Sequence, residues 1–246
     1  GTIAYSAAVG ACSRCQRWDV VLGLLGEMKW RRAMPNATTY SSAITSCEKA
    51  GRWQLATELL GEMRKLRVTP NVITYSAVIS VCEKGRNWGT VADLLGRMCD
   101  EQVTPNIVTF SAAVSACDKT LQWELAFDVL RRMRQTSVKP SLVTHNATIS
   151  ACARGRQWQM ALRLFHGMRD ATAIPDVVSF GAAASACEQG GAWLAALALL
   201  ARMARRAIQQ NTTVCHAVIS ACERGKAWRW ALLLLQDMRA RLLRPG

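Results

Sequence analysis

Ten cysteines are the residues of this sequence best suited to chemistry, because thiolates bind zinc, form disulfides and act as nucleophiles. Cys12 and Cys15 form one Cys-x-x-Cys pair, but a tetrahedral metal site needs a second half that the sequence does not supply. The others mostly recur at one fixed spacing, too regular and too wide for ligands of a single ion: Cys12, Cys47, Cys82, Cys117, Cys152, Cys187 and Cys222. We expect buried packing thiols in a reducing compartment, with no metal and no cofactor.

Histidine and serine give no catalytic set either. His145, His166 and His216 stand in three separate segments, so neither a Cys/His nor a Ser/His/Asp constellation can be assembled. The serines recur in parallel positions along the chain, which is a pattern of repetition and not of nucleophiles. The sequence therefore predicts a protein that is not an enzyme and has no small-molecule substrate.

Charge points to a polyanionic partner. The chain has 31 basic and 17 acidic residues, a net charge of +14 and a predicted isoelectric point near 9.8. Residues 1–128 carry 14 basic and 12 acidic side chains, whereas residues 129–246 carry 17 and 5, so the second half supplies most of the field. Arginine outnumbers lysine by 24 to 7, which suits phosphate binding and stacking on bases; a solvated basic surface is the alternative.

Composition excludes two further classes. Half of the residues are hydrophobic and a fifth are charged, which excludes intrinsic disorder. Charged or amide side chains interrupt every apolar stretch before it reaches the roughly 18 residues of a membrane span, so no membrane association is expected. The first residues lack the charged start and apolar core of a signal peptide, and any targeting segment would lie outside this chain.

A 35-residue period organises the whole sequence. Seven of the nine tryptophans, the cysteines above and seven of the nine methionines keep this spacing without a gap, which predicts a repeat protein of seven units. The repeats span residues 2–36, 37–71, 72–106, 107–141, 142–176, 177–211 and 212–246, one array over 2–246. The tryptophan column is Trp18, Trp53, Trp88, Trp123, Trp158, Trp193 and Trp228, and the methionine column is Met28, Met63, Met98, Met133, Met168, Met203 and Met238.

Each repeat is expected to be a helical hairpin. In the second repeat, Tyr40, Ala43, Ile44 and Cys47 share one face of a helix that Thr39 is placed to N-cap. After Ala50-Gly51, the residues Trp53, Ala56, Leu60 and Met63 line a second amphipathic helix, which ends before Val68. One hairpin cannot cover its own apolar face, so the repeats should stack into an all-α, right-handed α-solenoid superhelix of antiparallel hairpins.

The repeated motifs resemble those of the pentatricopeptide repeat. Thr39–Ala43, Ser46–Lys49, Leu59–Met63 and Val68–Asn71 carry the resemblance, which covers residues 2–246 and recurs seven times. The 35-residue period and the terminal proline followed by a small polar residue separate it from the tetratricopeptide repeat. Two departures are Gln210, which replaces the terminal proline in repeat 6, and Cys215, which replaces the helix aromatic in repeat 7.

The resemblance implies binding of single-stranded RNA, one base per repeat, read by two side chains. One reader follows the helix aromatic and the other follows the terminal proline; all pairs but the last two have side chains suited to reading. The pairs are Ser6 with Asn36, Ser41 with Asn71, Ser76 with Asn106, Ser111 with Ser141, Asn146 with Asp176, Gly181 with Asn211, and His216 with Gly246.

Side-chain chemistry agrees with the pairing rule that the family implies. An asparagine amide offers a donor and an acceptor, which match adenine, whereas aspartate only accepts and suits the ring N–H of uracil or guanine. Ser with Asn then assigns adenine to repeats 1–3, Ser with Ser a further adenine, and Asn with Asp uracil. Family members bind RNA in parallel, so the predicted core is 5′-A-A-A-(A)-U.

Two further columns fit RNA binding. Branched residues two positions before the aromatic would sandwich bases in this family, although they also suit the start of a helix: Ile3, Thr38, Ile73, Val108, Val143, Val178 and Thr213. Cations near the end of the first helix would meet phosphates or complement the helix dipole, with Gln189 as the exception: Arg14, Lys49, Lys84, Lys119, Arg154 and Arg224.

The leading prediction is a non-enzymatic RNA-binding array that acts in processing, stability, editing or translation of RNA in a mitochondrion or plastid (chloroplast). A second possibility is the RNA-targeting part of a larger enzyme whose further repeats or catalytic domain are absent from these 246 residues. A third is a peptide-binding scaffold, because a fold does not fix a function. The reader columns and the net charge favour RNA over a peptide.

Overall fold

A computed structural model describes residues 2–168 and 173–240 of the chain. The described residues form fourteen helices and no strand. The helices alternate between two kinds, here called A (odd numbers) and B (even numbers), so each 35-residue period holds one A helix and one B helix. The sequence-based expectation of an all-α array of helical hairpins is confirmed.

The two kinds of helix begin at equivalent residues in every repeat. The A helices are α1 (Thr2–Arg14), α3 (Ala37–Ser46), α5 (Val72–Lys84), α7 (Ile107–Lys119), α9 (Leu142–Arg154), α11 (Val177–Gly190) and α13 (Thr212–Arg224). The B helices each start on the periodic tryptophan: α2 (Trp18–Trp30), α4 (Trp53–Lys65), α6 (Trp88–Asp100), α8 (Trp123–Gln135), α10 (Trp158–Gly167), α12 (Trp193–Arg205) and α14 (Trp228–Ala240).

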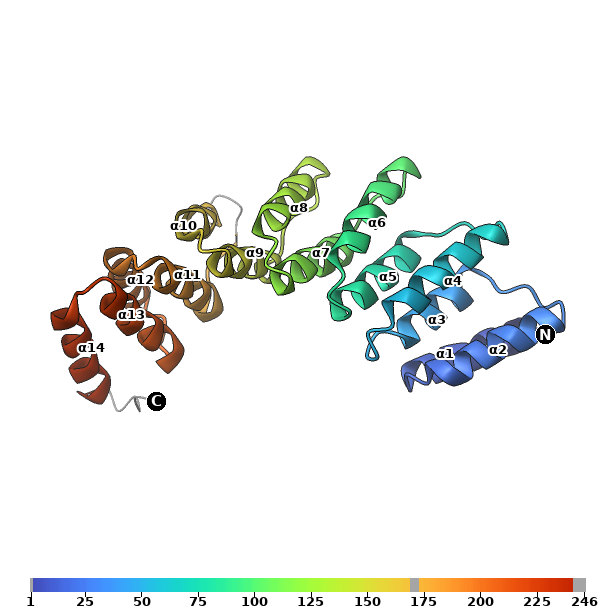
Figure 1. Ribbon diagram of the computed structural model, residues 1–246, viewed down its shortest axis with the longest axis horizontal. Coiled ribbons are helices and arrows are strands. Elements are labelled where there is room, and N and C mark those ends of the chain that lie inside the picture. The colour runs from blue at the N-terminus through green and yellow to red at the C-terminus, as the bar shows by residue number, and fades with distance from the viewer. Residues whose placement is uncertain (1, 169–172, 241–246) are drawn as a thin grey trace. The chain divides into compact units, whose positions relative to one another are not determined.

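The chain forms two compact blocks, Gly1–Thr120 (the N-terminal block) and Leu121–Gly246 (the C-terminal block). Within each block, every A helix packs on the next A helix, as α3 does on α5 and α9 on α11 (Figure 1). Where both lie in the same block, a B helix packs on the A helix of its own repeat and on that of the next, as α4 does on α3 and α5. This shared layering buries the apolar face that one hairpin leaves open.

The periodic columns are packing positions. The seven periodic methionines are buried, as are six of the seven periodic cysteines, while Cys12 is half-buried. Tyr40, Ala43 and Ile44 are fully buried, as their shared helical face predicts. Within the described residues, no helix is both long enough and apolar enough to cross a membrane.

Four of the periodic tryptophans pack against a glycine of the following repeat. A Cβ on Gly85, at the end of α5, would lie 2.5 Å from Cδ1 of Trp53, closer than carbon atoms can approach. The same contact recurs in the C-terminal block: Gly155 with Trp123, Gly190 with Trp158, and Gly225 with Trp193. The indole and the bare backbone therefore fit together at these four contacts.

Residues in the left-handed conformation follow the helices, both in the turn inside a hairpin and in the loop between two hairpins. Arg86 (φ 55°) lies between α5 and α6, and Arg67 (φ 56°) lies between α4 and α5. Glycine occupies this conformation only at Gly51 and Gly191 among the described residues. Elsewhere a non-glycine residue takes a conformation that costs about 1–2 kcal/mol, which the surrounding packing must offset.

Candidate nucleic-acid interface

The second reader of each pair caps the A helix of the next repeat. Asn36 precedes α3, and its Oδ1 accepts hydrogen bonds from the backbone N and the Oγ1 of Thr39, both at 2.9 Å. The sequence-based assignment of Thr39 as the N-cap is therefore wrong. Asn36 is the N-cap, and Thr39 lies inside the first helical turn, where its backbone amide is one of those that a helix start leaves without a partner in the helix.

Equivalent caps recur along the chain. The residue is half-buried or exposed in each case, so part of its side chain faces solvent while the rest holds the helix. The caps are Asn36 on α3, Asn71 on α5, Asn106 on α7, Ser141 on α9, Asp176 on α11 and Asn211 on α13. This column has a structural task whether or not it reads a base.

The first reader in repeats 1–3 is a serine whose hydroxyl points toward the next repeat. Ser6 Oγ lies 2.8 Å from Thr39 Oγ1, and Ser41 Oγ lies 2.9 Å from Thr74 Oγ1. Ser41 is 6 % exposed, so only a small part of it can meet a ligand. Each serine is thus joined to its partner asparagine by one threonine.

A threonine also joins the serine to the asparagine in repeat 3. Ser76 Oγ lies 2.7 Å from Thr109 Oγ1, which donates to Asn106 Oδ1 at 2.9 Å. The Ser76 hydroxyl also donates a hydrogen bond to the carbonyl oxygen of Val72, at 2.7 Å. The predicted pairs of repeats 1–3 are therefore brought together in space.

Repeat 5 brings its amide and carboxylate together. Asn146 Nδ2 lies 3.4 Å from Asp176 Oδ1, and Ser179 Oγ lies 2.7 Å from Asn146 Oδ1 and 2.9 Å from Asp176 Oδ1. Burial alone would raise the pKa of Asp176, but the hydrogen bonds from Ser179 and Asn146 outweigh it and lower that pKa. Asp176 is therefore an ionised acceptor at neutral pH.

The remaining predicted pairs are different. Ser111 lies on α7 in the N-terminal block, whereas Ser141 caps α9 in the C-terminal block. Gly181 on α11 brings no side chain to its partner Asn211, which caps α13. His216 is exposed on α13, and Gly246 lies outside the described residues.

The branched column expected to sandwich bases is solvent-exposed. All seven of its members are exposed near the start of an A helix: Ile3, Thr38, Ile73, Val108, Val143, Val178 and Thr213. Ile3 is 86 % and Val143 71 % exposed, which is unusual for aliphatic side chains in a packed array. An exposed apolar side chain beside each reader pair is a surface on which a base could stack.

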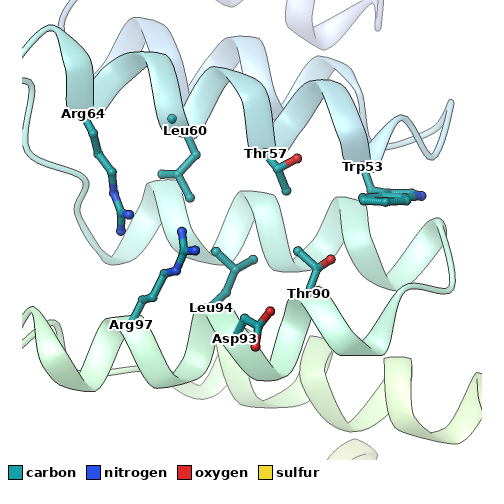
Figure 2. A pocket seen from close by; sticks show the side chains of 9 residues that line it. Trp53, Thr57, Leu60, Arg64, Thr90, Asp93, Leu94 and Arg97 are labelled. Carbon is teal, nitrogen blue, oxygen red and sulfur yellow. The ribbon is translucent and has the colours of Figure 1, made fainter.

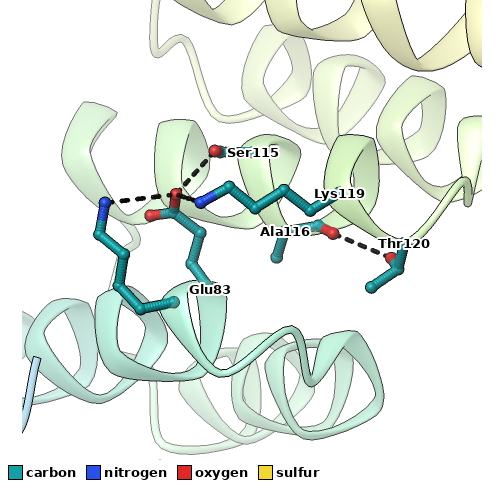
Figure 3. Close-up of polar contacts among 6 residues, drawn as sticks. Glu83, Ser115, Ala116, Lys119 and Thr120 are labelled. Carbon is teal, nitrogen blue, oxygen red and sulfur yellow. Dashed lines mark hydrogen bonds and ion pairs between the residues drawn. The ribbon is translucent and has the colours of Figure 1, made fainter. Parts of the chain in front are cut away.

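The cation column lies near the C-terminal end of the A helices. Arg14, Lys84, Arg154 and Arg224 are the last residues of α1, α5, α9 and α13, and all four are exposed, as is Lys49 just beyond α3. Lys119 differs, because its Nζ pairs with Glu83 Oε1 of the preceding repeat at 2.7 Å, and Ser115 binds the same oxygen (Figure 3). Lys84 is 4.0 Å from that oxygen. The cations thus differ in how free they are to meet a phosphate.

The helix aromatics supply a buried scaffold behind the readers. The Tyr40 hydroxyl donates to Glu62, whose pKa burial would raise but hydrogen bonds from Lys29 and Tyr40 lower. In repeat 5 this position holds His145, whose Nδ1 lies 3.0 Å from the carbonyl oxygen of Ser141 and whose Nε2 is buried without a hydrogen bond. Desolvation lowers the pKa of His145, so the ring is neutral.

The buried periodic thiols are unreactive by environment. None of the ten cysteines forms a disulfide, and burial raises the pKa of Cys117 and Cys152 to about 11. A thiol with so high a pKa stays protonated and is a poor nucleophile. Among residues 2–168 and 173–240, no three His, Cys, Asp or Glu side chains gather to hold a metal ion.

A separate hollow of about 220 Å³ lies between the B helices α4 and α6. Figure 2 shows Arg64 and Arg97 pointing toward one another at one end and Trp53 at the other. Arg64 already binds the Tyr75 hydroxyl and Glu101. The hollow belongs to the B layer, whereas the reader pairs lie at the starts of the A helices.

Sequence reasoning missed the hydroxyl column between the readers. Its members are buried and join the two residues of each pair: Thr39, Thr74, Thr109 and Ser179. The signal was present as a third polar column in the 35-residue period. The hydroxyl column has one exception, Val214, and the reader column has one at the corresponding pair, Gly181.

Family models match much of the chain. The pentatricopeptide repeat domain model matches residues 23–85 and 93–156, which is more than half of the sequence. The chain belongs to the pentatricopeptide repeat family. The shorter PPR repeat model matches residues 3–32, 73–103 and 143–171. No curated protein sequence matches the chain.

Solved pentatricopeptide repeat structures share the fold. The repeat protein PPR10 from maize is 18 % identical over 100 % of this chain and 40 % of its own, with a TM-score of 0.63. Its complex with an 18-nucleotide psaJ RNA element gives a TM-score of 0.57 at the same identity, over 100 % of this chain and 41 % of that chain. The pentatricopeptide repeat domain of Arabidopsis thaliana protein-only RNase P 1, in complex with tRNA, is 18 % identical over 73 % of this chain and 95 % of that domain, with a TM-score of 0.63. This chain spans about two fifths of the length of the maize protein.

Proposed function

We propose that this protein binds single-stranded RNA sequence-specifically, one base per repeat, with a core of 5′-A-A-A-(A)-U. The observation that carries the proposal is the recurrence, at the start of successive A helices, of two polar readers beside an exposed branched side chain. That set offers hydrogen bonds for a base edge and an apolar surface for its face.

The net charge and the similarity to solved structures support the same proposal. A net charge of +14 favours a polyanion, and the exposed cations that end the A helices recur with the same period as the readers. The structurally similar maize and Arabidopsis proteins are in complex with RNA and tRNA. By family habit, the protein would act on transcripts of a mitochondrion or plastid, as a binding array without a reaction of its own.

A second candidate is the RNA-targeting part of a larger enzyme. It is favoured by the similarity to the repeat domain of a protein-only RNase P, which this chain nearly covers. In that case the predicted base preference would be unchanged, and the reaction would belong to residues outside this sequence.

Fluorescence anisotropy with labelled 5′-AAAAUNN RNA, its uridine-for-adenine variant and the matching DNA, at two salt concentrations, tests the proposal. We expect binding that prefers RNA and is lost when uridine replaces adenine. Equal and steeply salt-dependent binding to all three would mean that charge alone acts. No binding at all would favour a peptide-binding scaffold.

A further inference from the structure

One buried hydroxyl lies between the two readers of each pair. Thr74, in the first turn of α5, is fully buried and lies 2.9 Å from Ser41 Oγ and 3.0 Å from Asn71 Oδ1. The hydroxyl belongs to the repeat after the serine, so the reading pair is completed by a residue 33 positions further along the chain. Thr39 and Thr109 take the same place in the pairs before and after it.

The hydroxyl protons of Ser41 and Thr74 can be assigned by counting donors and acceptors. Asn71 Oδ1 accepts from the Thr74 backbone N–H and from the Thr74 hydroxyl, which occupy its two lone pairs. Because Thr74 gives its only hydroxyl proton to Asn71, its oxygen must accept the proton of Ser41. Ser41 therefore presents only lone pairs outward, and Asn71 presents only its Nδ2–H₂ group.

That arrangement has a fixed polarity: one acceptor beside one donor. Adenine offers an exocyclic amine and a bare ring nitrogen, which complement the pair, whereas guanine offers a carbonyl oxygen and a ring N–H, which oppose it. The asparagine does not itself supply both groups, as its chemistry in isolation suggests. The acceptor comes from the serine, and the threonine makes it an acceptor.

Repeat 5 shows the arrangement with an acidic cap. Ser179 takes the place of threonine and contacts Asn146 Oδ1 and Asp176 Oδ1. The outward groups are then a proton of Asn146 Nδ2 and the second carboxylate oxygen of Asp176, a donor beside an acceptor. This reversed polarity complements the carbonyl oxygen and ring N–H of uracil.

Repeat 6 loses both members of the contact together. Gly181 replaces the first reader, and the fully buried Val214 replaces the hydroxyl residue. A Cβ on Gly181 would lie 3.8 Å from Val214 Cγ2, so the two positions still face each other. Asn211 nevertheless caps α13 through the Val214 backbone N at 2.9 Å. The helix start therefore needs the cap but not the hydroxyl.

We propose that the buried threonine or serine at the third position of α3, α5 and α11 is a positioning residue that sets the hydrogen-bond polarity of the preceding reader pair. This inference rests on the proposed RNA-reading function. Base choice would then depend on three residues, and the third acts only through the other two.

Thr74→Val tests the inference, because valine has nearly the same shape and already occupies this column at Val214. The readout is the ratio of affinities for RNA with adenine and with guanine at the second base. We expect Thr74→Val to lower this ratio about fivefold, since the freed Ser41 hydroxyl can turn its proton toward guanine. Thr74→Ser keeps the hydroxyl and should keep the ratio, and the ratio at the first base should not change.

The outcomes separate the two proposals. A wild-type protein with no base preference would overturn the base-reading function and this inference with it. A wild-type preference that persists undiminished in Thr74→Val would overturn the inference alone, as would a uniform loss of affinity for all bases. Thr39→Val, read at the first base, gives the same test independently if Thr74→Val does not fold, because Ser6 and Asn36 contact Thr39 as Ser41 and Asn71 contact Thr74.

Discussion

The N-terminal and C-terminal blocks repeat the same packing but not the same polar contacts. In repeats 1–3 a threonine hydroxyl links a serine to an asparagine at each helix start, as Thr74 links Ser41 to Asn71. In repeat 6 the corresponding place holds Gly181 and Val214, although the cap by Asn211 is kept. The helix start therefore keeps its cap where the hydroxyl contact is absent, so it does not depend on that contact.

The aromatic column shows the same contrast. Tyr5 and Tyr40 in the N-terminal block donate their hydroxyls to glutamates of the neighbouring B helix. In the C-terminal block this position holds His145 and Phe180, and the ring of His145 has an unsatisfied nitrogen. Burial of a ring is common to both blocks, but only the N-terminal tyrosines turn it into a polar contact with a charged partner.

The largest effect is expected where the packing is tightest. Gly190→Ala would place a Cβ 2.2 Å from Trp158 Cδ1, so α11 must shift, at a cost of about 2 kcal/mol. The N-terminal block tolerates Ala50 and Thr120 at this position, which makes the comparison sharp. Gly61→Ala is the control, because nothing lies within 4 Å of its Cβ and alanine should stabilise α4 by about 0.5–1 kcal/mol. Urea unfolding measures both; equal effects would refute the tryptophan–glycine account.

His145→Phe should stabilise the C-terminal block by about 1 kcal/mol, because it removes a buried nitrogen without a partner. It should also remove a pH dependence. Since burial holds the pKa of His145 below its unfolded value of 6.5, the unfolded chain takes up the proton first as pH falls. The wild-type contribution is complete above pH 6.5 and is lost progressively below it. Unfolding at pH 7.5 and 5.5 should show a smaller difference for the variant than for the wild type.

The smallest effect concerns two lysines at the same repeat position. Lys84 is more exposed than Lys119, which is already paired with Glu83. Lys84→Ala should weaken binding of every RNA alike and lower the slope of log affinity against log salt by about 0.7. Lys119→Ala should change that slope less. Salt titrations of both variants would contradict the assignment if Lys119→Ala had the larger effect.

Much of the fold could be read from the period. Three independent columns fixed the repeat, and the spacing from Tyr40 to Cys47 and from Trp53 to Met63 identified the two helices. The helix start was misplaced by three residues, because Asn36 and Thr39 are both good capping residues and one repeat alone does not separate them. The left-handed residues were also missed, since Arg67 and Arg86 carry no sign of that conformation.

The site could be predicted as columns but not as contacts. The period identifies the columns, and the family resemblance pairs Ser41 with Asn71. Neither predicts that Thr74 lies between them, because the Ser41–Thr74 contact joins two repeats. The pairing of Lys119 with Glu83 escaped for the same reason. Contacts between repeats depend on how hairpins stack, and a single period describes only what is inside a hairpin.

The most direct test of base reading is a compensating switch at one repeat. Asn71→Asp keeps the cap, as Asp176 does on α11, so the fold should be unchanged. It leaves two outward acceptors, the Ser41 oxygen and a carboxylate oxygen, and these complement the ring N–H and the exocyclic amine of guanine. Affinities of both proteins for RNA with adenine or guanine at the second base should show the wild type preferring adenine and the variant preferring guanine. A variant with the wild-type preference would contradict the assigned register and, with it, the account of how this array reads RNA.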